Sequence, residues 1–331
     1  MAISRMTQLS RISRKGQIVV LLLCCIIMLI IYGLQPNGQE SPLQMSQQLT
    51  KDEIGNPSTI LETSRISSLP YFSNDTLKWY NYTLLEVRNM SGPHVKANDP
   101  WLIDVIQRRF LVAPPPTDAP YHLKEPHTTD PSMGQSSKIL TILKNMTKGF
   151  FVECGALDGE TRSNTLFMER YLGWQGLLIE ADPINFQEML KRGRHAWLSP
   201  TCLSLHQYPT IVSFEQLQNK GRISESAVPG TERPGFVDVQ CLPLWSLLQA
   251  LKRTRIDYFS LDVEGHELEV LKTIPFDKVD IRTLSVEFIH GKDGKEVLRT
   301  YMENLGYVVD SEVTHPNWLA NDFIFKKKIE S

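Results

Sequence analysis

Carboxylate side chains in this chain occur where apolar segments end. The segment 149–159, GFFVECGALDG, combines an apolar run with Glu153, Asp158 and two glycines, and a second apolar run, 176–179, is followed by Glu180. Glycine lets a backbone approach a ligand closely. A carboxylate at the tip of the second strand of an open α/β sheet can accept hydrogen bonds from both hydroxyls of a ribose. The pattern predicts a pocket for a ribose-bearing ligand.

The glycine spacing narrows the choice of ligand. Gly155 and Gly159 are separated by three residues, whereas the dinucleotide fingerprint is G-x-G-x-x-G because its backbone wraps a pyrophosphate. The spacing here favours a nucleoside without a pyrophosphate, of which S-adenosylmethionine is the common example. The alternative is a strand, a tight turn and a helix with no ligand, because glycine is frequent in turns.

Two further apolar segments end in candidate catalytic residues. RIDYFSLDVEG contains Asp262 and Glu264, and TLSVEFIH contains Glu287 and His290. Methyl transfer from a sulfonium to an oxygen requires that the acceptor be aligned and its proton removed. His290 is the first candidate for the base because imidazole titrates near neutral pH, with Glu264 and Glu287 as alternatives. The competing interpretation is that His290 bonds Asp262 or Glu264 and fixes the loop.

The same four side chains offer hard oxygens and one imidazole, which are donors that divalent metals accept. No tight spacing such as H-x-x-x-H accompanies them. We therefore predict a base at His290 and no divalent metal. His266, next to Gly265, either joins this site or faces solvent.

The elements that position these residues alternate between strands and helices, which predicts a parallel sheet with helices on both faces. The predicted strands are the start of 149–159, 176–179, 196–205, 237–242, 255–264, 283–290, 306–309 and 321–326, the last two as an antiparallel edge hairpin. The predicted helices are 99–110, 136–144, one from about Ser163, 182–193, 244–251, 267–273 and 293–305. The polar insert 207–234 predicts a hairpin or a lid.

Four motifs occur in a fixed order, FVECGALDGE, LIEADP, LDVEGHE and VEFIH. Over residues 135–328 the series resembles FkbM-type methyltransferase domains. The resemblance implies an α/β fold with a Rossmann-like, seven-strand methyltransferase sheet and S-adenosylmethionine as cofactor. It assigns donor binding to the following residues: Glu153, Gly155, Asp158 and Gly159 at the methionine part and its loop, Glu180 at the ribose, Asp182 and the strand near Cys202 at the adenine, and Asp262.

An apolar run from Ile18 to Leu34 precedes this domain and has the length of a membrane-spanning helix. Basic residues precede it and the first acid after it is Glu40, so the positive-inside rule predicts a cytosolic N-terminus and a type II topology. A cleaved signal peptide is the alternative, although no small-x-small site follows. The predicted organisation is: 1–16 cytosolic tail, 17–34 transmembrane signal anchor, 35–98 flexible luminal stem, 99–134 accessory helix and Pro-rich linker, 135–331 methyltransferase domain.

Glycosylation sequons and cysteines agree with a luminal or extracellular domain. Asn74, Asn81, Asn89 and Asn145 each begin an N-x-[ST] sequence, and all follow the apolar run. Cys202 and Cys241 either form a disulfide, which an oxidising compartment permits, or remain buried thiols. Cys154 lies inside a predicted strand, so we expect a core residue there and not a nucleophile.

Two functions follow from these patterns, and neither involves nucleic acid, because a net charge of −2 over 331 residues gives no basic footprint. The first is transfer of a methyl group to a luminal hydroxyl by a membrane-anchored enzyme. The second follows from a resemblance of the whole chain to the Star and Star-like group of single-pass proteins, which carry an FkbM-type domain. That resemblance implies a trafficking factor that binds membrane-protein cargo and assists export of a growth-factor precursor from the endoplasmic reticulum to the Golgi and onward. The expected location is the endoplasmic reticulum, Golgi, endosomal or plasma membrane.

Overall fold

The structure is a computed structural model that describes residues 89–224, 226–231, 233–315 and 320–328, all within one compact unit. The predicted cytosolic tail, membrane anchor and most of the stem lie outside the described residues, as do Asn74 and Asn81. Among the described residues, no helix has both the length and the apolar composition that crossing a bilayer requires.

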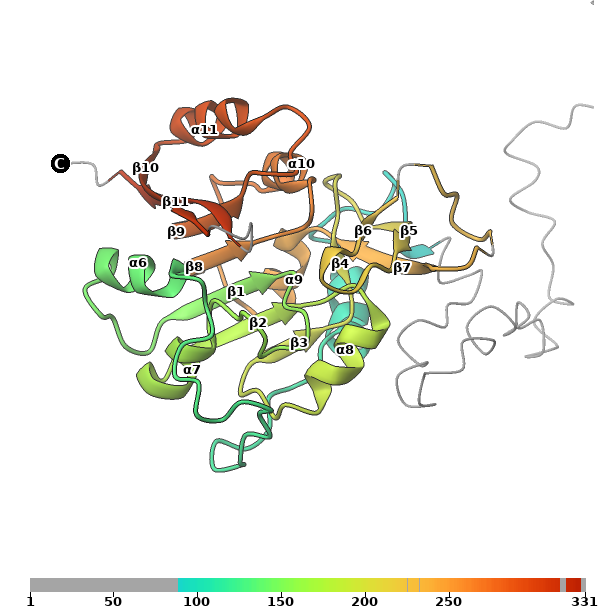
Figure 1. The fold of residues 1–331 in the computed structure, drawn as a ribbon. Helices are drawn as coiled ribbons and strands as arrows, with labels where there is room; N and C mark the ends of the chain where they lie inside the picture. The colour runs from blue at the N-terminus through green and yellow to red at the C-terminus, as the bar shows by residue number, and fades with distance from the viewer. Residues whose placement is uncertain (1–88, 225, 232, 316–319, 329–331) are drawn as a thin grey trace, which may run out of the picture. The chain divides into compact units, whose positions relative to one another are not determined.

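The main sheet has seven strands in the order β10-β11-β9-β8-β1-β2-β3 (Figure 1). Neighbours from β3 to β9 pair in parallel, and β11 pairs antiparallel with both β9 and β10. This confirms the predicted seven-strand α/β sheet with its antiparallel edge hairpin. The strands are β1 (Phe150–Cys154), β2 (Gln175–Ile179), β3 (Trp197–Ser199), β8 (Arg255–Leu261), β9 (Asp280–Glu287), β10 (Tyr307–Thr314) and β11 (Asn321–Lys327).

Helices cover both faces of this sheet because alternate strand residues point to opposite sides. In β1, Phe151 belongs to one apolar cluster and Val152 to the other. The first face carries α6 (Gln135–Ile142), α7 (Leu166–Leu172) and α8 (Pro183–Leu190). The second face carries α5 (Pro100–Val105), the π-helix Ile106–Phe110, α9 (Leu244–Ala250), α10 (Glu267–Thr273) and α11 (Lys295–Asn304).

The segment predicted as an accessory helix packs into the core of the sheet. Asp99 caps α5, accepting a hydrogen bond from the Trp101 N–H at 2.9 Å, and proline occupies the first turn as expected. Leu102, Ile106 and Phe110 are fully buried in the same cluster as the strands. The helix is therefore part of the folded domain and not a separate cover.

A second, four-stranded sheet follows the order β4-β7-β5-β6. Its strands are β4 (Cys202–Leu203), β5 (Thr210–Glu215), β6 (Arg222–Ile223) and β7 (Phe236–Leu242). The prediction of one strand over 196–205 is wrong: β3 ends before Pro200, which has no N–H for a ladder, and the chain then enters the second sheet as β4. The insert forms the predicted hairpin, β5–β6, with a 3₁₀ turn at Gln218–Lys220.

The strand order reverses between β1 and β8, because the chain adds β2 and β3 on one side of β1 and β8 and β9 on the other. In open α/β sheets, ligands bind outside the carboxyl ends of the strands at this switch point. The arrows of β1 and β2 point toward the second sheet in Figure 1. The fold thus places the strand tips and the second sheet around one space.

Candidate functional site

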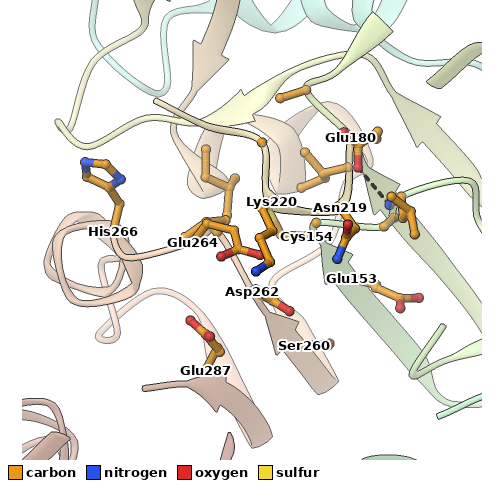
Figure 2. Close-up of a pocket in the computed structure, with 18 of the residues that line it drawn as sticks. Glu153, Cys154, Glu180, Asn219, Lys220, Ser260, Asp262, Glu264, His266 and Glu287 are labelled. Carbon is orange, nitrogen blue, oxygen red and sulfur yellow. Dashed lines mark hydrogen bonds between the residues drawn. The ribbon is translucent and has the colours of Figure 1, made fainter. Parts of the chain in front are cut away.

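A cavity of about 380 Å³ lies at the carboxyl ends of the central strands (Figure 2). Its walls include residues from the tips of β1, β2, β8 and β9 and from the second sheet. Glu153, Glu180 and Asp262, which are far apart in sequence, all contribute to it. The structure therefore brings the main predicted site residues together. Those that line the cavity are Glu153, Gly155, Glu180, Asp262, Glu264, Glu287 and His290.

Glu153 contributes to the wall, but its carboxylate turns away from the other acids (Figure 2). It accepts hydrogen bonds from the Ser163 hydroxyl at 2.9 Å, the Asn164 N–H at 2.8 Å and the Thr165 hydroxyl. Burial raises the pKa of Glu153, and nearby Arg194 and these donors oppose that rise. Its carboxylate fixes the loop after β1 to the start of α7, and its predicted contact with the donor stays a prediction.

Glu180 keeps the geometry of a ribose acceptor. Its Oε2 accepts from the Leu157 N–H at 2.7 Å and its Oε1 from the Asp182 N–H at 2.8 Å. A carboxylate oxygen has a second acceptor position, so each can still receive a hydroxyl from the cavity side. Burial raises the pKa of Glu180 to about 8, against the lowering effect of its backbone donors.

Asp158 and Gly159 do not line the cavity. Asp158 accepts from the Thr161 N–H at 2.7 Å and lies 3.5 Å from Arg192. Burial acts to raise the pKa of Asp158, but its backbone donors and Arg192 outweigh it and lower that pKa. A Cβ on Gly159 would lie 2.8 Å from Met189. These residues shape and pack the loop, and their predicted contact with the donor stays a prediction.

Asp182 also has a structural role instead of the predicted contact with the donor. It caps α8, accepting from the Ile184 N–H at 2.8 Å, and it accepts from the Gln216 amide of the insert at 3.1 Å. Beside it, the apolar side chains of Phe214 and Ile223 line the cavity. These insert residues were missed in the sequence because an irregular polar segment gives no periodic signal.

Two glycines let the loops at the strand ends approach one another closely, which brings the carboxylates of the site together. Gly155 has φ +82°, and a Cβ there would lie 2.0 Å from the Asp262 carbonyl oxygen. Gly265 has φ +108°, and a Cβ there would lie 2.8 Å from the His290 carbonyl oxygen. Only glycine combines an easily adopted positive φ with the absence of a Cβ. Gly155 thus joins the tips of β1 and β8, and Gly265 joins the loop after β8 to the end of β9.

His290 lies at the centre of the predicted catalytic group. Its Nδ1 is 2.7 Å from Glu287 Oε1 and 3.0 Å from Glu264 Oε2. Burial and the charges of Lys220 and Arg222 lower its pKa. Within the described part of the chain, Nε2 has no hydrogen-bond partner. The two interpretations of His290 are compatible, since one nitrogen bonds the carboxylates and the other remains accessible to a substrate.

Further carboxylates adjoin this group and were not singled out in the sequence. Glu267 accepts from the N–H groups of Val263 and Gly265, and Asp322 accepts from the Gln135 amide at 2.9 Å. Burial, followed by the charge of Asp262, raises the pKa of Glu267 and of Asp322 to about 7. One feature of the sequence could have indicated Asp322 as a site residue, because it is a carboxylate inside an otherwise apolar strand.

Burial and neighbouring carboxylates also raise the pKa of Glu264 to about 7. Two groups in this region have ligand-type atoms within 4.8 Å of one another. They are Glu264 with Glu287 and His290, and Asp262 with Glu267 and Glu287. His266 is buried and lines the cavity, and burial lowers its pKa. It therefore does not face bulk solvent.

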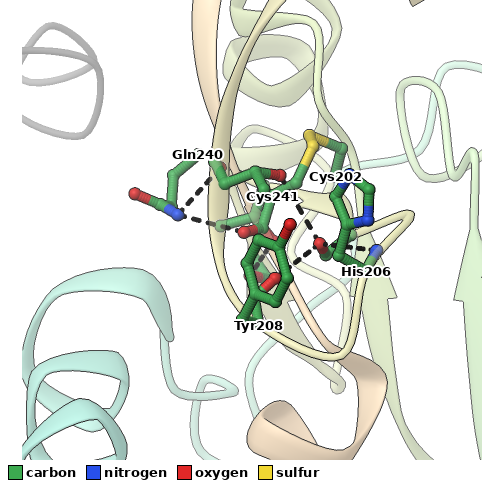
Figure 3. Close-up of a disulfide and its surroundings, with 9 residues drawn as sticks. Cys202, His206, Tyr208, Gln240 and Cys241 are labelled. Atoms are coloured by element: carbon green, nitrogen blue, oxygen red, sulfur yellow. Dashed lines mark hydrogen bonds between the residues drawn. A yellow bond between two sulfur atoms is a disulfide. The ribbon is translucent and has the colours of Figure 1, made fainter. Parts of the chain in front are cut away.

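Cys202 and Cys241 form a disulfide that joins the paired strands β4 and β7 (Figure 3). Cys202 also lines the cavity. Cys154 is free and buried, and burial raises its pKa, which leaves it in the unreactive thiol form. Asn89 and Asn145 are exposed.

The strand order and the cavity at the switch point define a Rossmann-like methyltransferase fold. Residues 153–309 match the model of the family described as the methyltransferase FkbM domain. This part of the chain is therefore similar to FkbM methyltransferase domains. No curated protein matches the chain.

Several solved methyltransferase structures are similar to the chain at low sequence identity. FkbM from Methylobacillus flagellatus KT is 15% identical, with a TM-score of 0.37, over 54% of this chain and 43% of that one, so this chain spans less than half of its length. A methyltransferase from Pyrococcus furiosus is 15% identical, with a TM-score of 0.32, over 59% and 83% of the two chains. The N1-methyltransferase for 1,6-didemethyltoxoflavin from Burkholderia thailandensis, solved with S-adenosylhomocysteine, is 11% identical, with a TM-score of 0.33, over 63% and 84%. No substrate is carried over from these proteins.

Proposed function

We propose that the chain binds S-adenosylmethionine and transfers its methyl group to a hydroxyl acceptor. The observation that carries this proposal is the single cavity in which Glu180 and the His290–Glu287 pair take part. One end offers a ribose acceptor next to apolar side chains of the second sheet. The other end offers a base and several carboxylates. The family match of the domain supports the choice of donor.

The donor fits the cavity with its ribose hydroxyls on Glu180 and its adenine against Phe214 and Ile223. The positive sulfonium then faces the carboxylates at the end of β8, of which Asp262 is open to the cavity. Opposite charges at short range in a partly enclosed site attract more strongly than in water. This orientation directs the methyl group toward the end of β9.

His290 would act as the base in the transfer. The acceptor oxygen attacks the methyl carbon, the carbon–sulfur bond breaks, and its electron pair stays on sulfur as neutral S-adenosylhomocysteine leaves. The acceptor proton passes to Nε2, while Nδ1 is oriented by Glu287 and Glu264. An imidazole fixed through one nitrogen and free at the other has the arrangement that general bases use.

Isothermal titration of the full chain, purified in detergent, with S-adenosylhomocysteine tests the proposal. We expect one site per chain, and we expect Glu180→Ala to weaken binding by about tenfold or more, because hydrogen bonds to a charged group contribute about 1.5–3 kcal/mol. Glu312→Ala, on exposed β10 and outside the cavity, is the matched control. The absence of binding by the natural chain would exclude the enzyme.

We further propose that the domain is luminal or extracellular and is anchored as a single-pass type II membrane protein. The Cys202–Cys241 disulfide supports an oxidising compartment, and the exposed Asn89 and Asn145 are accessible to a glycosyltransferase. Digestion of the cell-expressed chain with peptide N-glycosidase should increase its mobility on a gel. Unchanged mobility of the natural chain, together with protease sensitivity of the domain in sealed microsomes, would contradict this topology.

A non-catalytic trafficking role is the second candidate, and the hydrogen bonds of Glu153 and Asp158 are compatible with it. Glu153 and Asp158 hold the loop after β1, so a protein that kept only the fold would still require them. The presence of Glu153 and Asp158 therefore does not distinguish an enzyme from a trafficking factor. The double substitution Asp262→Ala, Glu264→Ala distinguishes an enzyme from a trafficking factor. Neither carboxylate is an ion-pair partner of a described lysine or arginine, so we expect the variant to keep its fold. Loss of methyl transfer with normal cargo export would favour trafficking as an independent function.

A further inference from the structure

One carboxylate of the site is buried with an oxygen that bonds nothing. Glu287 is 6% exposed, and its Oε1 is the atom that lies beside His290. Its Oε2 is buried and, within the described residues, has no hydrogen-bond partner. Buried polar atoms in folded proteins are nearly always bonded. An unpaired carboxylate oxygen in a cavity wall therefore points to a ligand that binds there.

Two other carboxylates face the same point from different elements. Asp262 follows β8 and opens to the cavity, and Glu267 begins α10 and is 2% exposed. One oxygen from each, with one from Glu287, lie within 4.8 Å of one another. Glu267 is held in place by the N–H groups of Val263 and Gly265, at 2.9 and 3.2 Å. The three oxygens are thus positioned before any ligand arrives.

No described lysine or arginine forms an ion pair with these three carboxylates, although the charge of Arg162 acts to lower the pKa of Asp262. Of the described residues, His290 alone lies within 4.0 Å of one of the three carboxylates as an ion-pair partner, and it contacts Glu287. Arg162 and Lys220 line the cavity but make no ion pair with the three. Like charges at this separation in a partly buried site repel strongly unless a proton or a bound cation neutralises them.

In contrast to the expectation from the sequence that no divalent metal binds, we propose that Asp262, Glu267 and Glu287 bind a divalent cation of the magnesium or manganese class. Carboxylate oxygens alone form the ligand set, which favours hard ions over zinc or copper. The neighbouring group around His290 is a weaker candidate, because its nitrogen already bonds Glu264 and Glu287. The consequence for chemistry rests on the proposed function: the cation lies near the acceptor, where it lowers the pKa of a bound hydroxyl.

Electron paramagnetic resonance of manganese tests the site without any methyl donor. The full chain in detergent should reduce the signal of free Mn²⁺ on binding, and Mg²⁺ should restore it by competition. Asp262→Asn and Glu287→Gln should each weaken Mn²⁺ binding by about tenfold or more. Glu312→Gln is the matched control, since it removes a charge from an exposed position of β10 outside the cavity, and it should change affinity by less than about threefold. Circular dichroism verifies that each variant is folded.

Three results would overturn the proposal. They are no Mn²⁺ binding by the natural chain at concentrations on the order of 1 mM, equal binding by the natural chain and both ligand variants, or an equal loss in the Glu312→Gln control. Titration with S-adenosylhomocysteine separates this proposal from the proposed function. Nucleoside binding without Mn²⁺ binding refutes the cation site alone, and Mn²⁺ binding without nucleoside binding refutes the methyltransferase alone.

Discussion

Carboxylates at the strand ends have two different tasks in this molecule. Those of Glu153 and Asp158 accept hydrogen bonds from their own loops and hold the backbone in position. Those of Asp262, Glu264 and Glu287 take part in the cavity, where few donors oppose their charge. Of these three only Glu287 is buried, and its Oε2 has no hydrogen-bond partner among the described residues. A buried polar atom without a partner is costly.

The pKa of Glu180 predicts that nucleoside binding depends on pH. 5′-Methylthioadenosine is the suitable probe because it has the ribose without an amino-acid group. The ionised carboxylate accepts both hydroxyls, and below its pKa of about 8 the proton must first be removed. Affinity should therefore rise with pH, by about tenfold per unit below pH 8, when measured by titration calorimetry. Glu180→Gln should bind weakly at every pH. A flat profile for the natural chain would refute the assignment of the ribose to Glu180.

At the scale of elements, the loops after β1 and β8 meet through backbone and the second sheet is fixed by a covalent bond. The Asp262 N–H donates to the Cys154 carbonyl oxygen at 3.2 Å, so the β1 and β8 tips stay in contact beyond the last strand residues. The disulfide joins β4 to β7 across 39 residues of sequence. Both features stabilise the cavity walls without taking part in chemistry.

Gly155→Ala should destabilise the domain strongly. The new Cβ would lie 2.0 Å from a backbone oxygen in a region of positive φ, and the conformation alone costs about 1–2 kcal/mol. Gly173→Ala is the matched control, because Gly173 has φ +64° and nothing within 4 Å of the added Cβ. Urea unfolding should show a larger loss of unfolding free energy for Gly155→Ala. Equal losses would mean that the contact between the β1 and β8 loops is not tight.

Removing the disulfide should destabilise the second sheet and weaken ligand binding. The disulfide links residues separated by 39 positions. In the chain-entropy treatment, a link of this span lowers the conformational entropy of the unfolded chain and so stabilises the folded state by about 4 kcal/mol. The variant Cys202→Ser, Cys241→Ser should lose stability on that order in urea unfolding, and its affinity for S-adenosylhomocysteine should fall, since Cys202 lines the cavity. Glu312→Ala, which changes an exposed residue outside the cavity, serves as the control. A double variant as stable as the natural chain would contradict this role.

At the scale of the whole molecule, the carboxylate cluster couples folding to pH. Glu264 has an ordinary pKa of 4.5 and Asp322 one of 3.8, and burial raises the pKa of both to about 7 in the folded state. Between these values the folded chain binds more protons than the unfolded chain. The free energy of unfolding therefore falls as pH rises through this window. Asp158, whose pKa is lowered, acts in the opposite direction only below pH 3.8.

The melting temperature of the chain without ligands should accordingly be higher near pH 5 than near pH 8. Differential scanning calorimetry across this range measures the slope. The double variant Glu264→Gln, Asp322→Asn should show a shallower slope, because it removes two of the groups that take up protons. A melting temperature that increases steadily toward pH 8 would show that the cluster is not protonated in the folded domain.

Several features of this domain follow from local sequence. Strand runs such as FFVEC and YFSL and the cap of α5 by Asp99 depend on neighbouring residues, so the α/β class, the edge hairpin and the positions of the acids at strand ends were predictable. The match of residues 153–309 to the FkbM domain agrees with the order of the motifs. The split of 196–205 into β3 and β4 was not foreseen, because the second sheet forms through pairing with β7, which is distant in sequence.

The sequence by itself determined which strands end in acids and in what order they occur, because both follow from apolar runs and turn residues along the chain. The tertiary structure alone decided the direction in which each carboxylate points. Glu153 turns to donors of the α7 loop, whereas Glu287 meets His290 and retains one unbonded oxygen. The physical reason is that a side chain turns to the donors and charges around it, and here these come from segments that folding brings together.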